Sequence, residues 1–279
     1  MTYDQLRQAL AAAAPGASLE FSLAPGEILE VEEQLVVSGI TVSISSAAPG
    51  ATISRAAWAN YSRIFEVRDG GHLSLVRVDI ANGMTDGDDG GCILVQGEGS
   101  ILTAEHMAVS DCQVLDQGSG PYFSHLGGGI AAKGGAQLQL QGVRVERCRS
   151  SNGGGVALQG GSSGAFADCW LQDCDTNPTA LRQTQSAGIF LNSRSVATWH
   201  GGGIVNCSNG MYGFCGAMFC FDSQYDMRNA IISGCHARGF GGGVVGSTFL
   251  GITDAPSIGN NTNVSISDWC ACTLDQAPT

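Results

Sequence analysis

The chain has 279 residues, of which 43% are hydrophobic, 14% are charged and 41 are glycines, a composition typical of a turn-rich all-β protein with a large core. Its formal net charge of −12 would repel a DNA or RNA backbone, which argues against a nucleic-acid partner. No stretch approaches the eighteen or so apolar residues of a membrane helix, so we expect no membrane insertion. The first residues lack the pattern of a signal peptide, which fits an intracellular protein, a processed mature chain or a part of a larger chain or assembly and leaves the compartment open.

Residues 3–14 (YDQLRQALAAAA) predict an amphipathic helix. Leu6 and Leu10 fall on one face, and Pro15 with Gly16 forms a stop signal. A stack of parallel strands exposes unpaired backbone and core at its ends. We therefore expect residues 1–16 to cap the first coil of a repeat structure.

Glycine doublets or near-doublets followed by an apolar residue recur along the chain. They are Gly90-Gly91-Cys92, Gly128-Gly129-Ile130, Gly154-Gly155-Val156, Ala187-Gly188-Ile189, Cys215-Gly216-Ala217 and Gly242-Gly243-Val244. The second residues of successive motifs are separated by 38, 26, 33, 28 and 27 positions, which predicts a coil of about 26 to 28 residues that accepts insertions.

Apolar residues alternate at constant offsets after each motif, which predicts three short strands per coil with one inward face. The expected inward pairs include Ile130/Ala132, Leu138/Leu140 and Val143/Val145 in one coil, and Ala217/Phe219 in a later one. Such strands cannot fold alone but share one core when stacked in register. The sequence predicts a right-handed parallel β-helix of about eight coils over residues 30–270, in a single domain spanning 1–279.

A cysteine follows each of four motifs at a constant distance of 19 residues, and Cys112 follows Gly91 at 21. We expect five cysteines to form an inward column of buried, mostly unpaired side chains that fill a corner of the core. They are Cys112, Cys148, Cys174, Cys207 and Cys235. A disulfide ladder is the alternative, because the coil rise of about 4.8 Å suits the Cα separation of a disulfide. Zinc is less favoured, since a column is not a tetrahedron.

Length varies mainly between each cysteine and the next glycine motif, so one corner of the coil carries the insertions. Residues 114–126 and 175–186 form long insertions at this corner, with the short segment 149–152 between them. This corner predicts a binding site for a glycan or protein partner. The expected ligand-binding residues are Tyr122, Phe123, His125 and Arg182. The alternative is that one insertion packs on the other.

Asp86, Asp88 and Asp89 concentrate three carboxylates before the Gly90-Gly91 corner. Such a loop could hold calcium, although an acidic turn is the commoner explanation and no later bidentate glutamate follows. We expect no other cofactor.

The order of apolar pair, cysteine, short turn and glycine motif is seen in VRVERCRSSNGGGVAL and IISGCHARGFGGGVV. It resembles the Gly-Gly-Ala-Ile repeat of the polymorphic outer membrane protein and pectin-lyase-like β-helix families, over residues 30–270, with cysteine where the outer membrane repeats carry asparagine. The resemblance implies a β-helix at the cell surface or outside the cell. It leaves activity open, because that superfamily spans polysaccharide lyases, hydrolases, epimerases, adhesins and scaffolds.

His200 precedes three glycines, superficially like the histidine of β-helical polygalacturonases. The paired carboxylates that glycoside hydrolysis requires are not assembled around it, so a surface or corner histidine is the better interpretation. We therefore expect a non-catalytic structural or binding module that presents its insertion-bearing corner to a partner. The alternative is a β-helical carbohydrate-active enzyme, a polysaccharide lyase, hydrolase or epimerase.

Overall fold

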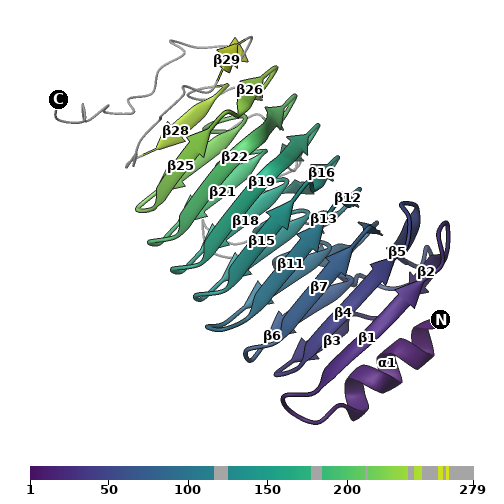
Figure 1. The fold of residues 1–279 in the computed structure, drawn as a ribbon. Coiled ribbons are helices and arrows are strands. Elements are labelled where there is room, and N and C mark those ends of the chain that lie inside the picture. Colours follow the sequence, from purple (N-terminus) through teal and green to yellow (C-terminus); the bar gives the residue numbers. More distant parts are fainter. Residues whose placement is uncertain are drawn as a thin grey trace.

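The computed structural model describes residues 1–115, 125–176, 184–210, 213–237, 242–246, 257–259 and 262–263. These residues form a right-handed parallel β-helix, a rod of stacked coils with one helix at its N-terminal end (Figure 1). No helix in this part of the chain has the length and apolar character needed to cross a bilayer.

The helix α1 (Tyr3–Ala12) covers the N-terminal end of the rod, as expected (Figure 1). Thr2 begins it with a capping box, in which its side chain accepts from the Gln5 amide and the Gln5 side chain accepts from the Thr2 amide. Leu6 and Leu10 are buried against the coils, and α1 contacts β2 (Ile28–Val31) and β3 (Leu35–Ser38). The cap shields the open end of the apolar core from water.

Three parallel sheets, here called A, B and C, run along the rod. Sheet A has two rows of strands, which β19 (Ser163–Gln172) and β22 (Val196–Val205) join because each runs through both. Its other first-row strands are β1 (Ser18–Leu23), β4 (Thr41–Ser46), β7 (His72–Val76), β11 (Ile101–Glu105), β15 (Gln137–Gln141) and β25 (Gln224–Arg228). Its other second-row strands are β2, β5 (Ala51–Arg55), β8 (Val78–Ala81), β12 (Ala108–Ser110), β16 (Arg144–Glu146), β26 (Ile231–Ser233) and β29 (Ser257–Gly259).

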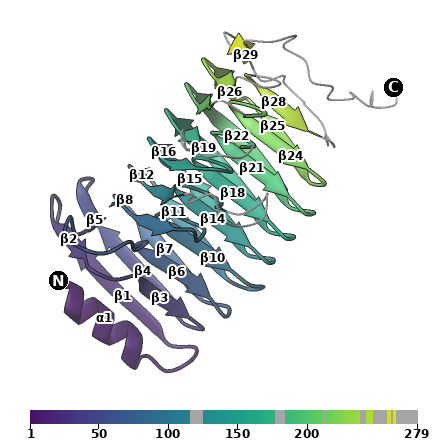
Figure 2. The ribbon, with the colours of Figure 1, turned by 180° about the vertical axis from the view of Figure 1, so that it is seen from behind.

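Sheets B and C complete each coil. Sheet B, whose strands follow one another along the rod in Figure 2, contains β3, β6 (Phe65–Arg68), β10 (Ile93–Gln96), β14 (Ile130–Lys133), β18 (Val156–Gln159), β21 (Ile189–Asn192), β24 (Met218–Phe221) and β28 (Val244–Gly246). Sheet C contains β9 (Met84–Asp86), β13 (Gln113–Leu115), β17 (Arg149–Ser150), β20 (Asp175–Thr176), β23 (Ser208–Asn209), β27 (His236–Ala237) and β30 (Thr262–Asn263).

The coil count and the strand count differ from the expectation. Six coils, from β6 to β27, have strands in both rows of sheet A and in sheets B and C, and partial coils flank them, so the number of complete coils is slightly below the predicted number of about eight. Each of these coils also carries a strand in sheet C that the three-strand prediction missed. These strands have only two or three residues, which is too short for an alternating apolar pattern to be recognised.

At the bends between strands, the chain turns at single residues whose backbone has a left-handed conformation. At the bend between the two rows of sheet A they include Arg77 (φ 56°), His106 (53°) and Asp168 (51°), and at the bend before sheet C they include Asn82 (62°) and Asp111 (57°). One residue with positive φ redirects the chain while its neighbours stay extended. The polar and glycine residues between the apolar pairs therefore set the corners.

The core consists of ladders of identical positions. Ile93, Ile130, Val156, Ile189 and Met218 pair in sequence across sheet B and are all buried. This register corrects one predicted pair. Ala217 and Phe219 were expected to point inward, but the residues in register with Ile189 and Leu191 are Met218 and Cys220. The glycine motif of that coil is displaced by one residue, and a shift of one reverses every side chain in a strand.

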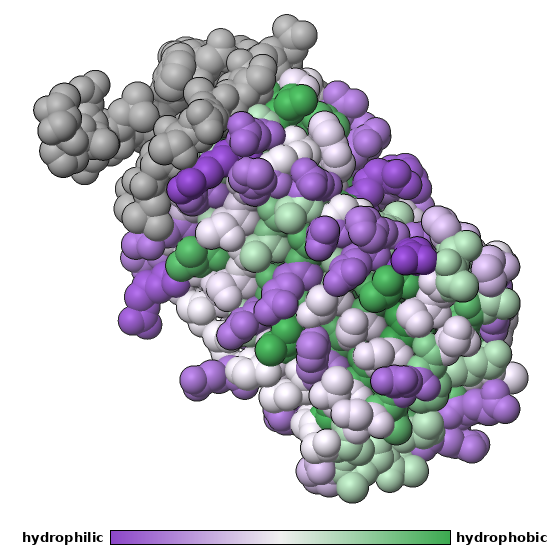
Figure 3. Space-filling model, viewed as in Figure 1, coloured by the Kyte–Doolittle hydropathy of each residue, from purple (hydrophilic) through white to green (hydrophobic). Residues whose placement is uncertain are grey.

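A second, smaller apolar cluster lies on the outer side of sheet B. Leu94, Ala131, Ala157 and Phe190 pair in register there, and Leu126 at the end of an insertion packs with them. Phe219 continues this row, with its ring 5.9 Å from that of Phe190. The end of the 114–126 insertion thus packs on the coils. Figure 3 shows the most hydrophobic residues as separate spots among hydrophilic ones on the face drawn there.

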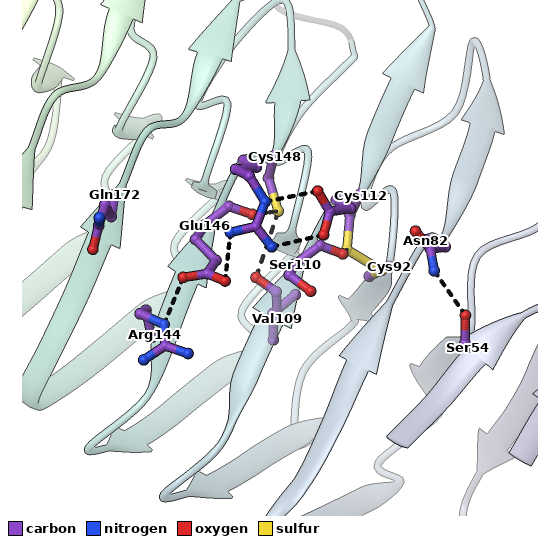
Figure 4. A network of polar contacts seen from close by, with 12 residues as sticks. Ser54, Asn82, Cys92, Val109, Ser110, Cys112, Arg144, Glu146, Cys148 and Gln172 are labelled. Carbon is purple, nitrogen blue, oxygen red and sulfur yellow. Dashed lines mark hydrogen bonds and ion pairs between the residues drawn. A yellow bond between two sulfur atoms is a disulfide. The ribbon is translucent and has the colours of Figure 1, made fainter. Parts of the chain in front are cut away.

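The five column cysteines are all buried, as predicted. Cys148, Cys174, Cys207 and Cys235 are thiols, as predicted for most of the column, whereas Cys112 forms a disulfide with Cys92 (Figure 4).

The disulfide has a local cause. Gln113 pairs with Met84 in sheet C, so Gly83 occupies the place of a cysteine in the preceding coil. A Cβ on Gly83 would lie 2.7 Å from the Cys92 sulfur. The missing side chain thus gives Cys92 the space to reach the column.

Candidate functional site

The insertion-bearing corner, where the chain passes into sheet B, contains an open pocket in its N-terminal coils. We call it the corner pocket. It has a volume of about 680 Å³ and is lined by residues 32–34, residues 58–63, and Thr85, Asp86 and Asp88. These three segments precede sheet B on successive coils, so the pocket is assembled from loops stacked on a rigid scaffold.

Two aromatic side chains are exposed at the corner pocket. Trp58 has 67% of its surface exposed and Tyr61 has 58%, and both line the pocket. Large aromatic side chains usually gain stability from burial, so two exposed ones in a single pocket make it a candidate binding surface.

Arg55 holds the loop that carries Trp58. Its Nε donates to the carbonyl of Asn82 at 2.9 Å, and its Nη1 donates to the carbonyls of Ala56 and Ala59 at 3.3 and 2.8 Å. One guanidinium thus fastens both sides of Trp58 to the following coil. The loop is further joined to that coil by a bridge between Ser62 and Met84. The aromatic side chains therefore stand on a fixed backbone.

Arg63 is the buried cation of the corner pocket. It is 4% exposed and forms an ion pair and hydrogen bond with Asp88. Burial by itself would raise the pKa of Asp88, but the charge of Arg63 and its hydrogen bond outweigh burial and hold the pKa below its usual range. The buried Nε of Arg63 has no acceptor among the described residues. The Arg63 guanidinium thus has an acidic partner at Nη2 but no acceptor at Nε among the described residues.

The remaining acidic residues of the corner pocket stand open to solvent. Glu32, Glu33 and Asp86 are exposed and take part in no ion pair within the described residues. The hydroxyl of Tyr3 on α1 fixes the backbone of Glu33 by accepting from its amide at 3.2 Å and donating to its carbonyl at 3.3 Å. The N-terminal cap therefore also positions one wall of the pocket.

The three predicted metal-binding carboxylates are separated by their partners. Asp88 pairs with Arg63, whereas Asp89 pairs with Lys133 at 3.0 Å and accepts from the Leu126 amide at 2.9 Å. Asp86 is exposed and lines the pocket. Among the residues that the structure describes, no group of three or more metal-ligating side chains is placed to hold a metal ion. The calcium interpretation stays a prediction.

Of the predicted ligand-binding residues, Tyr122, Phe123 and Arg182 lie outside the described residues. His125 is described, and it is only 5% exposed, with a left-handed backbone (φ 61°). Its carbonyl accepts from the amide of Asn152 on the next coil at 3.2 Å. The structure thus places His125 inside the corner rather than on an open surface.

A second hollow, the strand-face groove, lies on the outer side of sheet A and has a volume of about 650 Å³. Outward residues of β11, β15, β19, β22 and β25 line it, and the small Ala165 and Ala167 sit between longer side chains on the neighbouring strands. Arg228 binds Asp226 through hydrogen bonds of 2.7 to 3.1 Å. His200 is exposed in this groove, which agrees with its interpretation as a surface histidine.

The sequence favoured the same corner as the binding site but did not single out Trp58, Tyr61 and Arg63. The available signal was the segment AAWANYSR, in which two aromatic residues occur among small and polar residues without the alternation of a strand. Tryptophan and tyrosine in a turn-like segment, with no inward position to occupy, are candidates for exposure. The insertions drew attention to later coils instead.

No protein-family model matches the chain. No curated protein sequence matches it either. Among solved structures, ORF18 of Geobacillus virus E2 is similar at 11% sequence identity and a TM-score of 0.26, over 93% of this chain and 58% of that protein. The chain thus spans less than two thirds of the length of that protein.

Proposed function

We propose that this protein is a non-catalytic binding module that holds a glycan at its corner pocket. The observation that carries the proposal is the exposure of Trp58 and Tyr61 in one open pocket with hydrogen-bonding side chains. Ligand sites combine apolar and aromatic walls with a few polar groups that orient the ligand.

The chemistry of the pocket suits a sugar. A sugar ring has apolar C–H faces and a rim of hydroxyl groups, so an aromatic face can cover the ring while amides and carboxylates bond the hydroxyls. Gln34 and Asn60 supply amides, and Glu32, Glu33 and Asp86 supply carboxylates. The rigid coils keep these groups in place before the ligand arrives, which lowers the entropic cost of binding.

The resemblance of the coil pattern to pectin-lyase-like β-helices is part of this proposal, as is an extracellular or cell-surface location. Both are consistent with a protein that recognises polysaccharide. A protein segment as the partner is the competing outcome, and a direct binding experiment separates the two.

The test is binding of the full chain to a collection of immobilised oligosaccharides, followed by calorimetric titration of those that bind. We expect Trp58→Ala and Tyr61→Ala each to weaken binding about tenfold or more, because central aromatic residues dominate binding energy. Phe221→Ala is the matched control, since Phe221 is 49% exposed and lies outside the corner pocket. Unchanged binding in both pocket variants, or no glycan binding at all, would contradict the proposal.

The enzyme alternative is tested with the same material. Incubation with neutral and uronate polysaccharides should release neither reducing ends nor unsaturated products. Product formation that Glu105→Gln or Asp226→Asn abolishes would show that the strand-face groove is catalytic and would overturn the non-catalytic proposal.

A further inference from the structure

We infer that the corner pocket selects glycans with protonated amino groups, that is, amino sugars without the N-acetyl group, over neutral and acidic glycans. The inference rests on the proposed function, and it names the ligand class of the same pocket. Three features of the pocket support it: its charge, its aromatic walls and the way in which its one cation is used.

The charge of the pocket is negative. Four carboxylates line it, those of Glu32, Glu33, Asp86 and Asp88, against the single guanidinium of Arg63. Arg63 pairs with Asp88, which leaves three exposed carboxylates that form no ion pair with any described residue. Arg55, which precedes the Trp58 loop in the sequence, binds the backbone carbonyls of Ala56, Ala59 and Asn82 and does not line the pocket. A uronate or sulfated sugar would be repelled here, whereas an ammonium group would be attracted.

The aromatic walls of the pocket also favour a cationic ligand. The faces of Trp58 and Tyr61 carry partial negative charge, and a cation held over such a face is attracted to it. Exposed aromatic residues together with free carboxylates are therefore complementary to a group that is both apolar and cationic. An amino sugar has this combination, because its ring presents C–H groups and its nitrogen carries the charge.

Arg63 has a role that fits this ligand. The ion pair with Asp88 ties residues 58–63 to residues 85–88. The Nε of Arg63 is buried and has no acceptor among the described residues, so the guanidinium of this pocket-lining residue keeps an unused donor for an oxygen acceptor. Sugar hydroxyls and ring oxygens are acceptors of this type. The pocket thus offers carboxylates to the amine and a donor to the oxygens.

The test compares glucosamine oligomers with N-acetylglucosamine oligomers of the same length by calorimetric titration. At about pH 6 and low salt, where the amines carry protons, we expect the amine form to bind on the order of tenfold more tightly. This preference should shrink as salt is added, because exposed charges are screened. The triple variant Glu32→Gln/Glu33→Gln/Asp86→Asn should reduce the affinity for the amine form to that for the N-acetyl form.

The matched control is Glu20→Gln/Glu30→Gln/Glu98→Gln, which removes the same charge from exposed positions outside the corner pocket. It should keep the preference if the effect is local. Equal or tighter binding of the N-acetyl form to the unmodified protein would overturn this inference while the proposed function stands. If neither form binds but another glycan does, the inference also fails. Binding of no glycan would remove the proposed function with it.

Discussion

The ion pair between Arg63 and Asp88 should stabilise the fold as well as the pocket, and Asp88→Asn measures how much. Arg63 is 4% exposed, so its guanidinium has lost most of its contact with water, whereas the Asp88 side chain is 56% exposed and remains partly screened. Exposed ion pairs contribute up to about 1 kcal/mol, and breaking a fully buried pair costs about 3 to 5 kcal/mol. For this half-exposed pair we expect Asp88→Asn to lower the free energy of unfolding by about 1 to 2 kcal/mol at neutral pH.

The pH dependence follows from the lowered pKa of Asp88. A carboxyl whose pKa is lower in the folded than in the unfolded state stabilises the fold above its unfolded pKa of about 3.9 and loses that contribution as the pH falls through the folded pKa. The difference between unmodified protein and Asp88→Asn should therefore be full at about pH 7 and smaller at an acidic pH below the unfolded pKa.

Urea unfolding monitored by circular dichroism at both pH values gives these free energies. Asp86→Asn is the matched control, because Asp86 lies in the same loop but forms no ion pair among the described residues. Its effect should stay within about 0.5 kcal/mol. If Asp88→Asn costs no more than Asp86→Asn, or costs the same at both pH values, the ion pair does not stabilise the protein and the reasoning is refuted.

Three further predictions concern the loop, the disulfide and the insertion. Arg55→Met should leave the coils folded but weaken glycan binding about as much as Trp58→Ala, since it releases the carbonyls on both sides of Trp58; retained affinity would show that the loop needs no such anchor. Replacing both Cys92 and Cys112 by serine should lower the free energy of unfolding by about 3 kcal/mol, from a sequence separation of 20 residues, as measured by urea unfolding without reductant; an unchanged midpoint would contradict it. Leu126→Ala should lower the free energy of unfolding by about 2 to 3 kcal/mol in the same assay, because Leu126 is buried on the outer side of sheet B. If it costs no more than Ile28→Ala, a change at an exposed residue, the end of the insertion does not contribute to stability.

For the column cysteines, the sequence spacing predicted the buried positions but not the disulfide. Constant spacing was enough to place Cys148, Cys174, Cys207 and Cys235 inside, because an inward position in one coil is inward in every coil of the same register. The constant spacing could not predict the disulfide partner of Cys112. Cys92 belongs to a glycine motif 20 residues earlier, and its pairing depends on the space above Gly83, which is a property of two stacked coils and not of either segment alone.

The sequence by itself determined the architecture, since alternating apolar pairs at fixed offsets permit one stacked arrangement with a common core. It also placed the helical cap and identified the corner that accepts insertions. Only the tertiary structure decided which residues meet at that corner. Residues 32–34, 58–63 and 85–88 lie about one coil apart in the chain but contribute to a single pocket, and the partners Arg63–Asp88 and Tyr3–Glu33 are separated by 25 and 30 residues. Periodicity reports which side of a strand faces the core, whereas a binding pocket depends on how irregular loops from neighbouring coils fit together, and no repeat pattern records that.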